Sequence, residues 1–277
     1  MGPDERSRLP DKAASRPART RLDAAVSQRT GMTRSQARSL IMEARVRVDG
    51  AVATKAGHST PADAAIEIEH PRRYVSRGGE KLEAALEAFE LDVRGAQALD
   101  VGASTGGFTD CLLQRGAGHV TAVDVGYGQL DWRLRGDPRV TVMERTNFRL
   151  LPDDAFDGGF DVIVVDASFI SIRTILKRAA RELRAGADAV CLVKPQFEAG
   201  RERLGSGGVV RDPAVHRAVL FETRDAIVQL GLVPVALVAS PLLGPAGNRE
   251  FFMRVRHDGT PFAEDDVDRI VSGAPLE

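Results

Sequence analysis

The chain has 277 residues, of which 43% are hydrophobic and 28% are charged. This length allows one large domain or two of ordinary size, and this composition supports a buried core and excludes wholesale disorder. The longest apolar runs, such as Val162–Val165, are far shorter than the roughly 20 residues of a membrane helix, and the charged N-terminus is unlike a secretory signal peptide. Two cysteines, Cys111 and Cys191, are too few for a disulfide framework or a cysteine-based metal site, so we expect a cytoplasmic protein without a metal or a membrane partner.

The net charge of −1 is divided unevenly along the chain. Residues 1–80 hold 15 Lys and Arg against 10 Asp and Glu, whereas residues 81–277 hold 23 against 29. A basic module joined to an acidic body is compatible with binding to a polyanion such as nucleic acid. An ordinary solvated surface would give the same excess, so charge alone leaves both interpretations open.

The N-terminal quarter predicts a tail followed by two short helices. Residues 1–18 are rich in Pro, Ala, Arg and Ser without periodicity, which predicts a mobile tail. Helical spacing then begins near Leu22 and is broken by Gly31. Thr33 is expected to cap a second helix that carries apolar residues on one face and arginines on the other.

A short β segment completes this module. Residues 46–52 predict a hairpin with an Asp-Gly turn, and Ile66 and Ile68, which alternate with acids, predict one more strand. Residues 21–68 resemble an S4 RNA-binding domain, on the segments Arg-Leu-Asp (21–23), Thr-Arg-Ser-Gln-Ala (33–37) and Val-Arg-Val-Asp-Gly (46–50) in that order. The resemblance implies that RNA phosphates are bound by Arg21, Arg34, Arg38, Arg45 and Arg47.

Asp23 has two possible roles. Arg-Leu-Asp also surrounds the catalytic aspartate of pseudouridine synthases. At the start of an S4-like domain, however, Asp23 is expected to be a helix-start carboxylate rather than a catalyst.

From Ala96 onward, strand-like and helix-like segments alternate, which predicts a mostly parallel sheet with helices on both faces. The expected strands are Ala98–Val101, Val120–Val125, Val140–Met143, Asp161–Asp166, Ala189–Lys194, Val233–Val238 and Phe251–Arg256. Helical patterns include Arg173–Leu183 and Ala214–Gly231. Only the Gly/Pro loop Ser240–Arg249 joins the last two strands, so we expect them to pair antiparallel in a Rossmann-like domain.

The first of these strands runs into a glycine-rich turn that would let the backbone approach a ligand closely. Asp124 follows where an acid accepts hydrogen bonds from ribose hydroxyls in this fold. Ser104 stands where a dinucleotide would need glycine, whereas S-adenosylmethionine has no phosphate and carries an ammonium group that Asp100 can help to hold. We therefore predict an S-adenosylmethionine site, with NAD and a ligand-free tight turn as alternatives. The residues expected to contact the donor are Asp100, Gly102, Ala103, Ser104, Gly106, Gly107, Phe108, Asp124 and Asn147.

Four ionisable residues stand at positions that this fold would bring together. Asp166 and Lys194 end the fourth and fifth strands, Glu250 begins the last, and Lys81 stands just ahead of the sheet's first helix. A ribose 2′-hydroxyl needs a positioned base, and a lysine can serve where a neighbouring cation and desolvation favour its neutral form. The carboxylates would orient the ammonium group, and no metal is required. Taken singly, each of these residues is more often a surface or salt-bridge residue.

Four segments, in matching order, resemble the TlyA/haemolysin A family of S4-containing ribosomal RNA 2′-O-methyltransferases, which are related to the FtsJ/RrmJ fold. They are residues 100–108, 165–171, 192–198 and 247–250. The resemblance implies a class I methyltransferase domain whose seven-stranded sheet has an antiparallel last strand, and methylation of cytidine in ribosomal RNA. It places the family's Lys-Asp-Lys-Glu centre on Lys81, Asp166, Lys194 and Glu250, with Lys194 as the base and the others tuning and positioning it.

The predicted divisions are a tail (1–18), an S4-like domain (19–72), a linker (73–80), a methyltransferase domain (81–260) and a C-terminal tail (261–277). By the resemblance, residues 74–79 couple RNA docking to donor binding, with a flexible hinge as the alternative. Arg77 in this segment is a further RNA-binding candidate. The expected partner is ribosomal RNA within ribosomal subunits, and a monomer is favoured.

Several alternatives stay open. The chain could be a non-catalytic RNA-binding or ribosome-assembly factor, a pore-forming haemolysin, or a methyltransferase that modifies a base. Phe108, Trp132 and Phe148 are expected in the core or the wall of the cofactor pocket. Residues 205–210 are expected to form a mobile surface loop rather than a lid over RNA.

Overall fold

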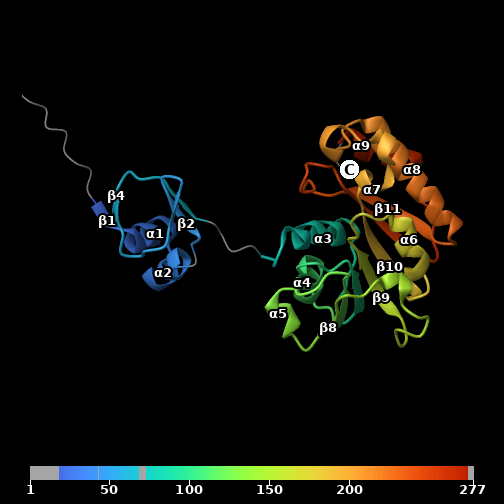
Figure 1. Cartoon of the computed structure of the whole chain (residues 1–277), viewed down its shortest axis with the longest axis horizontal. Helices are drawn as coiled ribbons and strands as arrows, with labels where there is room; N and C mark the ends of the chain where they lie inside the picture. The colour runs from blue at the N-terminus through green and yellow to red at the C-terminus, as the bar shows by residue number, and fades with distance from the viewer. Residues whose placement is uncertain (1–18, 43, 69–72, 274–277) are drawn as a thin grey trace, which may run out of the picture. The chain divides into compact units, whose positions relative to one another are not determined.

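The computed structural model describes residues 19–42, 44–68 and 73–273. By their contacts the residues divide into unit 1, residues 1–71, and unit 2, residues 72–277, and each is described by itself (Figure 1).

Unit 1 is a small α+β module, as the sequence predicts. Its elements are β1 (Arg19–Arg21), α1 (Leu22–Thr30), α2 (Arg34–Met42), β2 (Val46–Val48), β3 (Ala51–Ala53), β4 (Ser59–Pro61) and β5 (Ile66–Ile68). Strand β1 pairs antiparallel with β4, and β2 lies between β3 and β5 with both pairings antiparallel. The two helices and the sheet enclose a core that includes Leu22, Val26 and Ile41.

Local signals in unit 1 act as predicted. Gly31 ends α1 in the left-handed conformation, with φ 74°. Thr33 caps α2: its Oγ1 accepts the Gln36 N–H, and Gln36 Oε1 in turn accepts the Thr33 N–H, which is the reciprocal capping arrangement. Asp49 and Gly50 have φ values of 50° and 78°, so both central residues of the β2–β3 hairpin are left-handed, as a type I′ turn requires.

Unit 2 is built on a seven-stranded sheet. Its strands are β6 (Gln97–Val101), β7 (His119–Val123), β8 (Val140–Met143), β9 (Phe160–Val165), β10 (Leu183–Val193), β11 (Val233–Ala239) and β12 (Phe251–Arg256). They lie in the order β11-β12-β10-β9-β6-β7-β8. Strand β12 is antiparallel to both of its neighbours, whereas the β6, β7, β8, β9 and β10 pairings are parallel. The predicted fold, with its antiparallel last strand, is confirmed.

Helices cover both faces of this sheet, which buries its apolar strands on two sides (Figure 1). They are α3 (Arg77–Ala88), α4 (Gly107–Gln114), α5 (Trp132–Arg135), α6 (Ile172–Ala179), α7 (Pro195–Glu198), α8 (Pro213–Gln229) and α9 (Glu264–Ser272). Short 3-10 turns occur at Phe148–Leu150, Arg201–Arg203 and Ser206–Gly208. Helices α3 and α4 pack together on one face, and α6, α8 and α9 belong to the core of the other. This two-sided covering leaves the carboxyl edge of the sheet to form the site.

Two predicted boundaries in unit 2 are wrong. The helix expected over Arg173–Leu183 ends at Ala179, because Leu183 already pairs with Phe160 of the neighbouring strand. The C-terminal tail expected over 261–277 contains α9, which packs against α8 and β11 and buries Val267 and Ile270. Apolar residues at helical spacing among the acids of this segment were the signal for it.

The segment predicted as a linker over 73–80 belongs to unit 2. Tyr74 is buried, and its ring lies where a Cβ at Gly79 would overlap it. The Val75 N–H donates to Asp110 Oδ2 at 2.8 Å, and Ser76 caps α3, which begins at Arg77. The flexible-hinge alternative is therefore wrong for residues 74–79, because they are anchored to the start of α3 and to α4.

Candidate active site

Two adjoining cavities open at the carboxyl ends of the parallel strands. The larger cavity, about 530 Å³, is lined by the ends of β6, β7 and β9 and by residues 146–149. The smaller cavity, about 270 Å³, is lined by the start of α3, the glycine-rich turn and the four predicted catalytic residues. Gly102, Ser104 and Asp166 line both, so the two cavities meet at the turn.

The glycines of this turn are required mainly by close packing. Gly102 has φ 90°, and a Cβ there would lie 2.5 Å from the backbone oxygen of Asp166. A Cβ at Gly106 would overlap Leu134, and one at Gly107 would overlap the Ser76 side chain. Gly107 lines the smaller cavity, whereas Gly106 lines neither. The predicted part of Gly106 in donor binding stays a prediction, and the contact that requires a glycine there is with Leu134.

Asp124 organises the larger cavity. Its Oδ2 accepts the Ser104 N–H at 2.8 Å, and its Oδ1 accepts the Gly126 N–H at 2.7 Å. A carboxylate offers about four lone-pair sites, so Asp124 keeps acceptor capacity for ligand hydroxyls. Asn147 and Phe148 also line this cavity, as predicted for a donor-contacting residue and a pocket wall. Ala103 and Phe108 line the smaller cavity instead.

Asp100 lies beneath the site rather than in it. It is fully buried, its Oδ2 accepts the Thr109 hydroxyl at 2.6 Å, and its Oδ1 has no hydrogen-bond partner. Burial, with smaller contributions from the nearby Asp166 and Asp124 carboxylates, raises the pKa of Asp100 to about 7, against the lowering effect of the hydrogen bonds from Thr109. Asp100 lines neither cavity, and its predicted part in holding the donor's ammonium group stays a prediction.

The four ionisable residues meet in two ion pairs on the wall of the smaller cavity. Lys81 Nζ lies 2.5 Å from Glu250 Oε2, with both side chains almost fully buried. Lys194 Nζ lies 2.5 Å from Asp166 Oδ1. Lys81 comes from the second turn of α3, Glu250 directly precedes β12, and Asp166 and Lys194 directly follow β9 and β10. The predicted convergence of these side chains on one cavity is confirmed, whereas their chemical roles stay predictions.

Sequence reasoning missed a clamp around Lys194. Lys194 Nζ donates to Ser168 Oγ at 2.9 Å. At the other end of α7, the buried Glu198 carboxylate accepts the Ser171 hydroxyl at 2.6 Å and the Ile172 N–H at 2.7 Å. Helix α7 is thus tied at both ends to the segment that carries Asp166. Ser168 and Glu198 lie in residues 165–171 and 192–198, two of the segments that carry the family resemblance. That resemblance was the signal that could have identified them as site residues.

The aromatic residues differ from expectation in two places. Trp132 is 79% exposed, so its predicted place in the core or pocket wall is wrong. Phe169, which was not predicted as a site residue, is 91% exposed, and its backbone lies in the left-handed region with φ 64°. It lines the larger cavity, and its ring centroid lies 5.1 Å from that of Phe197.

Residues 205–210 are held in place. Val209 and Val210 are buried, the Val210 N–H donates to Asn248 Oδ1 at 2.9 Å, and Asn248 Nδ2 donates to the Gly208 carbonyl. The expectation of a mobile surface loop is therefore wrong at its C-terminal end.

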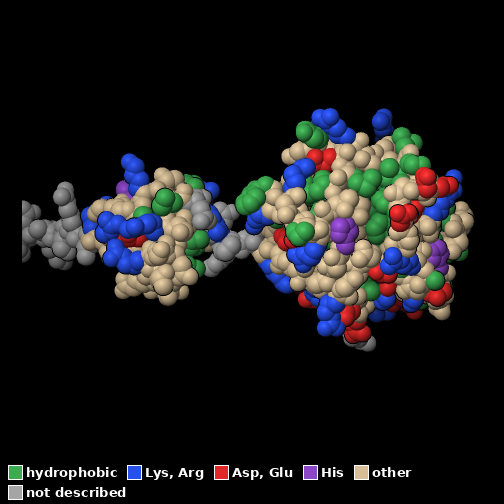
Figure 2. Space-filling view, turned by 90° about the horizontal axis from the view of Figure 1, so that it is seen from below, with side chains coloured by type: hydrophobic (Ala, Val, Ile, Leu, Met, Phe, Trp, Pro, Cys, Tyr) green, Lys and Arg blue, Asp and Glu red, His purple; other side chains and the backbone are tan. Residues whose placement is uncertain are grey.

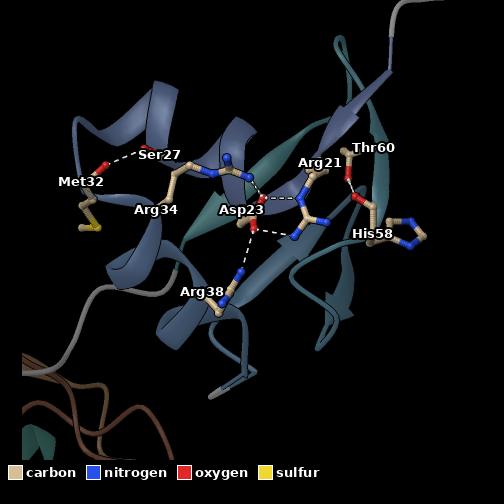
Figure 3. Close-up of polar contacts among 8 residues, drawn as sticks. All are labelled: Arg21, Asp23, Ser27, Met32, Arg34, Arg38, His58 and Thr60. Atoms are coloured by element: carbon tan, nitrogen blue, oxygen red, sulfur yellow. Dashed lines mark hydrogen bonds and ion pairs between the residues drawn. The ribbon is translucent and has the colours of Figure 1, made fainter.

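The predicted RNA-binding arginines lie mostly on the surface. In unit 1, Arg21, Arg34 and Arg38 surround Asp23, which lies in the first turn of α1 as predicted (Figure 3). Arg47 is exposed and Arg45 is half-buried. In unit 2, Arg77 is exposed and lines the smaller cavity.

Within the part of the chain that the structure describes, no helix is long and apolar enough to cross a membrane. The same residues contain no group of three or more His, Cys, Asp and Glu side chains arranged to hold a metal ion.

Comparison with known proteins matches both units. The FtsJ-like methyltransferase family model matches residues 74–257, and the S4 domain model matches residues 20–59. The chain is 48% identical to a Mycobacterium tuberculosis protein named 16S/23S rRNA (cytidine-2'-O)-methyltransferase TlyA, over 93% of this chain and 99% of that one. It is 40% identical to Hemolysin A of Brachyspira hyodysenteriae, over 79% of this chain and 92% of that one. The solved structure of a candidate hemolysin from Streptococcus thermophilus is 39% identical and superposes with a TM-score of 0.71, covering 94% of this chain and 96% of that one.

Proposed function

The chain belongs to the TlyA family of FtsJ-like methyltransferases that carry an S4 domain, and we propose that it transfers a methyl group from S-adenosylmethionine to the 2′-hydroxyl of a cytidine in ribosomal RNA. One observation carries the proposal. Two lysines and two carboxylates from distant parts of the chain line one small cavity, which adjoins a larger cavity at the glycine-rich turn.

The larger cavity fits S-adenosylmethionine better than a dinucleotide. Its volume, about 530 Å³, is in the ordinary range for small-molecule sites. The Ser104 N–H, which a pyrophosphate would need at this turn, is already bonded to the Asp124 carboxylate. The Asp124 carboxylate beside the turn also repels phosphates and favours a cationic ligand. In this proposal Asp124 accepts from the donor's ribose, and Asn147 and Phe148 lie along its adenine side.

When bound, S-adenosylmethionine supplies a methyl group on a positively charged sulfur. In this proposal Lys194 accepts the proton of the 2′-hydroxyl after it has released a proton of its own to solvent, since its Nζ pairs with the Asp166 carboxylate in the structure. Asp166 then holds the resulting ammonium group, and Ser168 fixes its direction. Lys81, which is held by the buried ion pair with Glu250, would place its side chain beside the reacting oxygen.

RNA would reach the smaller cavity past exposed groups that suit it. Arg77, which lines the smaller cavity, offers a contact to phosphate, and the exposed ring of Phe169, which lines the adjoining larger cavity, offers a stacking surface for a base. The S4-like unit would bind RNA with its arginines, since phosphate contacts position a nucleic acid without reading its sequence.

The test is transfer of tritiated methyl groups to separated, unmethylated ribosomal subunits by wild type, Lys194→Ala and Lys177→Ala. Lys177 is an exposed lysine on α6 and serves as the matched control. Loss of a general base costs about 10²–10⁴-fold in rate, so Lys194→Ala should abolish labelling while RNA affinity stays within a few-fold. Full activity in Lys194→Ala would remove it as the base.

The same experiment separates the alternatives. Wild type that binds RNA without labelling it would be a non-catalytic factor. Nuclease digestion and mass spectrometry of the product locate the methyl group on the sugar, as proposed, or on the base. Leakage from liposomes without labelling of RNA would favour the lytic activity that the relative's name suggests.

A further inference from the structure

A buried carboxylate in unit 1 gathers three exposed arginines. Asp23 is 1% exposed, whereas the side chains of Arg21, Arg34 and Arg38 are 52%, 59% and 60% exposed. Arg21 donates to Asp23 from Nε at 3.1 Å and from Nη2 at 2.8 Å, and Arg34 donates from Nη2 at 3.0 Å. Arg38 Nη2 lies 3.8 Å from the same carboxylate. Figure 3 shows the three guanidinium groups converging on Asp23 from the start of α1 and from α2.

This cluster keeps most of its charge and most of its donors for a ligand. Three guanidinium groups and one carboxylate sum to a charge of +2. A guanidinium has five N–H donors, of which Arg21 uses two on Asp23 and Arg34 uses one. The remaining donors belong to side chains that are more than half exposed, and Figure 2 shows basic side chains gathered on one face of unit 1. The cluster is therefore a positively charged surface with a fixed geometry.

We propose that Asp23 is a positioning residue that holds Arg21, Arg34 and Arg38 as one site for two neighbouring phosphates of the RNA backbone. The charge of +2 matches the charge of two phosphodiesters. This inference rests on the proposed RNA substrate and adds to it a defined phosphate site, with an acid as its organising group.

The physical reason is pre-organisation. Ordering a free arginine side chain on binding costs conformational entropy, and that cost weakens phosphate contacts made by mobile arginines. Here the bonds to Asp23 restrict Arg21 and Arg34 before RNA arrives. The hydrogen bond from Arg21 also holds the pKa of Asp23 well below its usual range, which outweighs the opposing effect of burial, so the organising charge persists across neutral pH.

Long-range electrostatics and positioning by Asp23 predict opposite effects of one substitution on RNA affinity. This substitution therefore distinguishes the two explanations. Asp23→Asn removes a negative charge from a surface that binds a polyanion, so simple electrostatics predicts tighter RNA binding. Loss of positioning predicts weaker binding. Asp63→Asn is the matched control, because Asp63 is an exposed acid of the same unit that makes none of these contacts.

The measurement is fluorescence anisotropy of labelled poly(U) RNA with the full chain, over a series of salt concentrations. Asp23→Asn should weaken binding about 5–10-fold and lower the slope of log affinity against log salt by about one. Asp63→Asn should bind as tightly as wild type or more tightly. An Asp23→Asn variant that binds as tightly as wild type would overturn the proposal.

A second substitution keeps the test valid if Asp23→Asn disturbs folding. Arg21→Lys preserves the charge but cannot form the two-bond fork with Asp23. It should weaken poly(U) binding several-fold, whereas Arg29→Lys, which changes an exposed arginine that is bonded to the Ala62 and Ala64 carbonyls, should stay within about twofold of wild type. Equal affinities for Arg21→Lys and wild type would overturn the proposal. Because poly(U) binding requires no methyl transfer, this result stays separate from failure of the proposed enzymatic activity.

Discussion

The ion pair between Lys81 and Glu250 joins residues 169 positions apart and is almost completely removed from water. Replacing one partner leaves the other as an isolated buried charge, whereas replacing both leaves none. We therefore expect Lys81→Met and Glu250→Met each to destabilise unit 2 strongly and the double variant to regain most of that loss. Methionine is chosen because it is unbranched, like both natural side chains, and carries no charge.

The expected size follows from burial. Lys81 and Glu250 are 8% and 1% exposed, and breaking a pair at such depth costs about 3–5 kcal/mol. In a domain the size of unit 2, each kcal/mol lowers Tm by roughly 2–4 °C, so a loss of about 3 kcal/mol lowers Tm by roughly 6–12 °C. Replacing both members of a buried pair is often neutral, so the double variant should melt within a few degrees of wild type.

Thermal unfolding followed by far-UV circular dichroism measures these differences, with chemical denaturation as a check on the free energies. Methyl transfer by the double variant then separates stability from function: if the pair supplies charge to the reaction, the double variant is folded and inactive. Single variants that lose less than about 1 kcal/mol would refute the burial argument. A double variant as unstable as the singles would show that each residue acts through other partners.

Two further predictions concern groups next to the site. The pKa of Asp100 is raised to about 7, so the folded state holds a proton that the unfolded state releases near pH 4, and this residue costs stability increasingly as pH rises from about 4 to 7. In denaturant titrations, the unfolding free energy of Asp100→Asn should therefore rise relative to that of wild type between pH 5 and pH 8. A difference between the two proteins that does not change with pH would contradict this. Glu198→Gln weakens the acceptor for Ser171 and Ile172, so it should lower kcat about tenfold while donor affinity and the KM for RNA stay within about twofold. Glu202→Gln, at an exposed acid nearby, is the control, and an effect on KM alone would contradict a positioning role.

The order of elements could be predicted because it depends on local patterns. Short β-branched runs separated by helical spacing predict a parallel sheet, and each of the seven expected strands overlaps an observed one, although β10 begins at Leu183 rather than at Ala189. Boundaries were predicted less well where local signals overlap. Residues 180–183 continue a helical pattern, but pairing of Leu183 with β9 takes that residue into the sheet. Helix α9 was overlooked because its apolar spacing is short and lies among acids.

The positions of the site residues followed from the fold, whereas their contacts did not. Strand ends meet at one edge of a parallel sheet, so Asp166 and Lys194 could be brought together from sequence. The choice of ion-pair partners was not predictable in this way. Glu250 pairs with Lys81 rather than with Lys194, and this depends on how α3 packs beside the sheet. The complete burial of Asp100 also depended on packing, because the sequence shows only that an acid lies near the end of this strand.

The sequence by itself determined the two units, the class of fold and the residue types available for chemistry, because composition, periodicity and turn residues act over short stretches of chain. Only the tertiary structure decided which charges became partners and which stayed available. Partnership depends on distance and burial, and these arise when residues as far apart as Lys81 and Glu250 are packed against each other. The arginines around Asp23 are a second example. The sequence shows that they belong to one small module, whereas packing buries Asp23 among their exposed guanidinium groups.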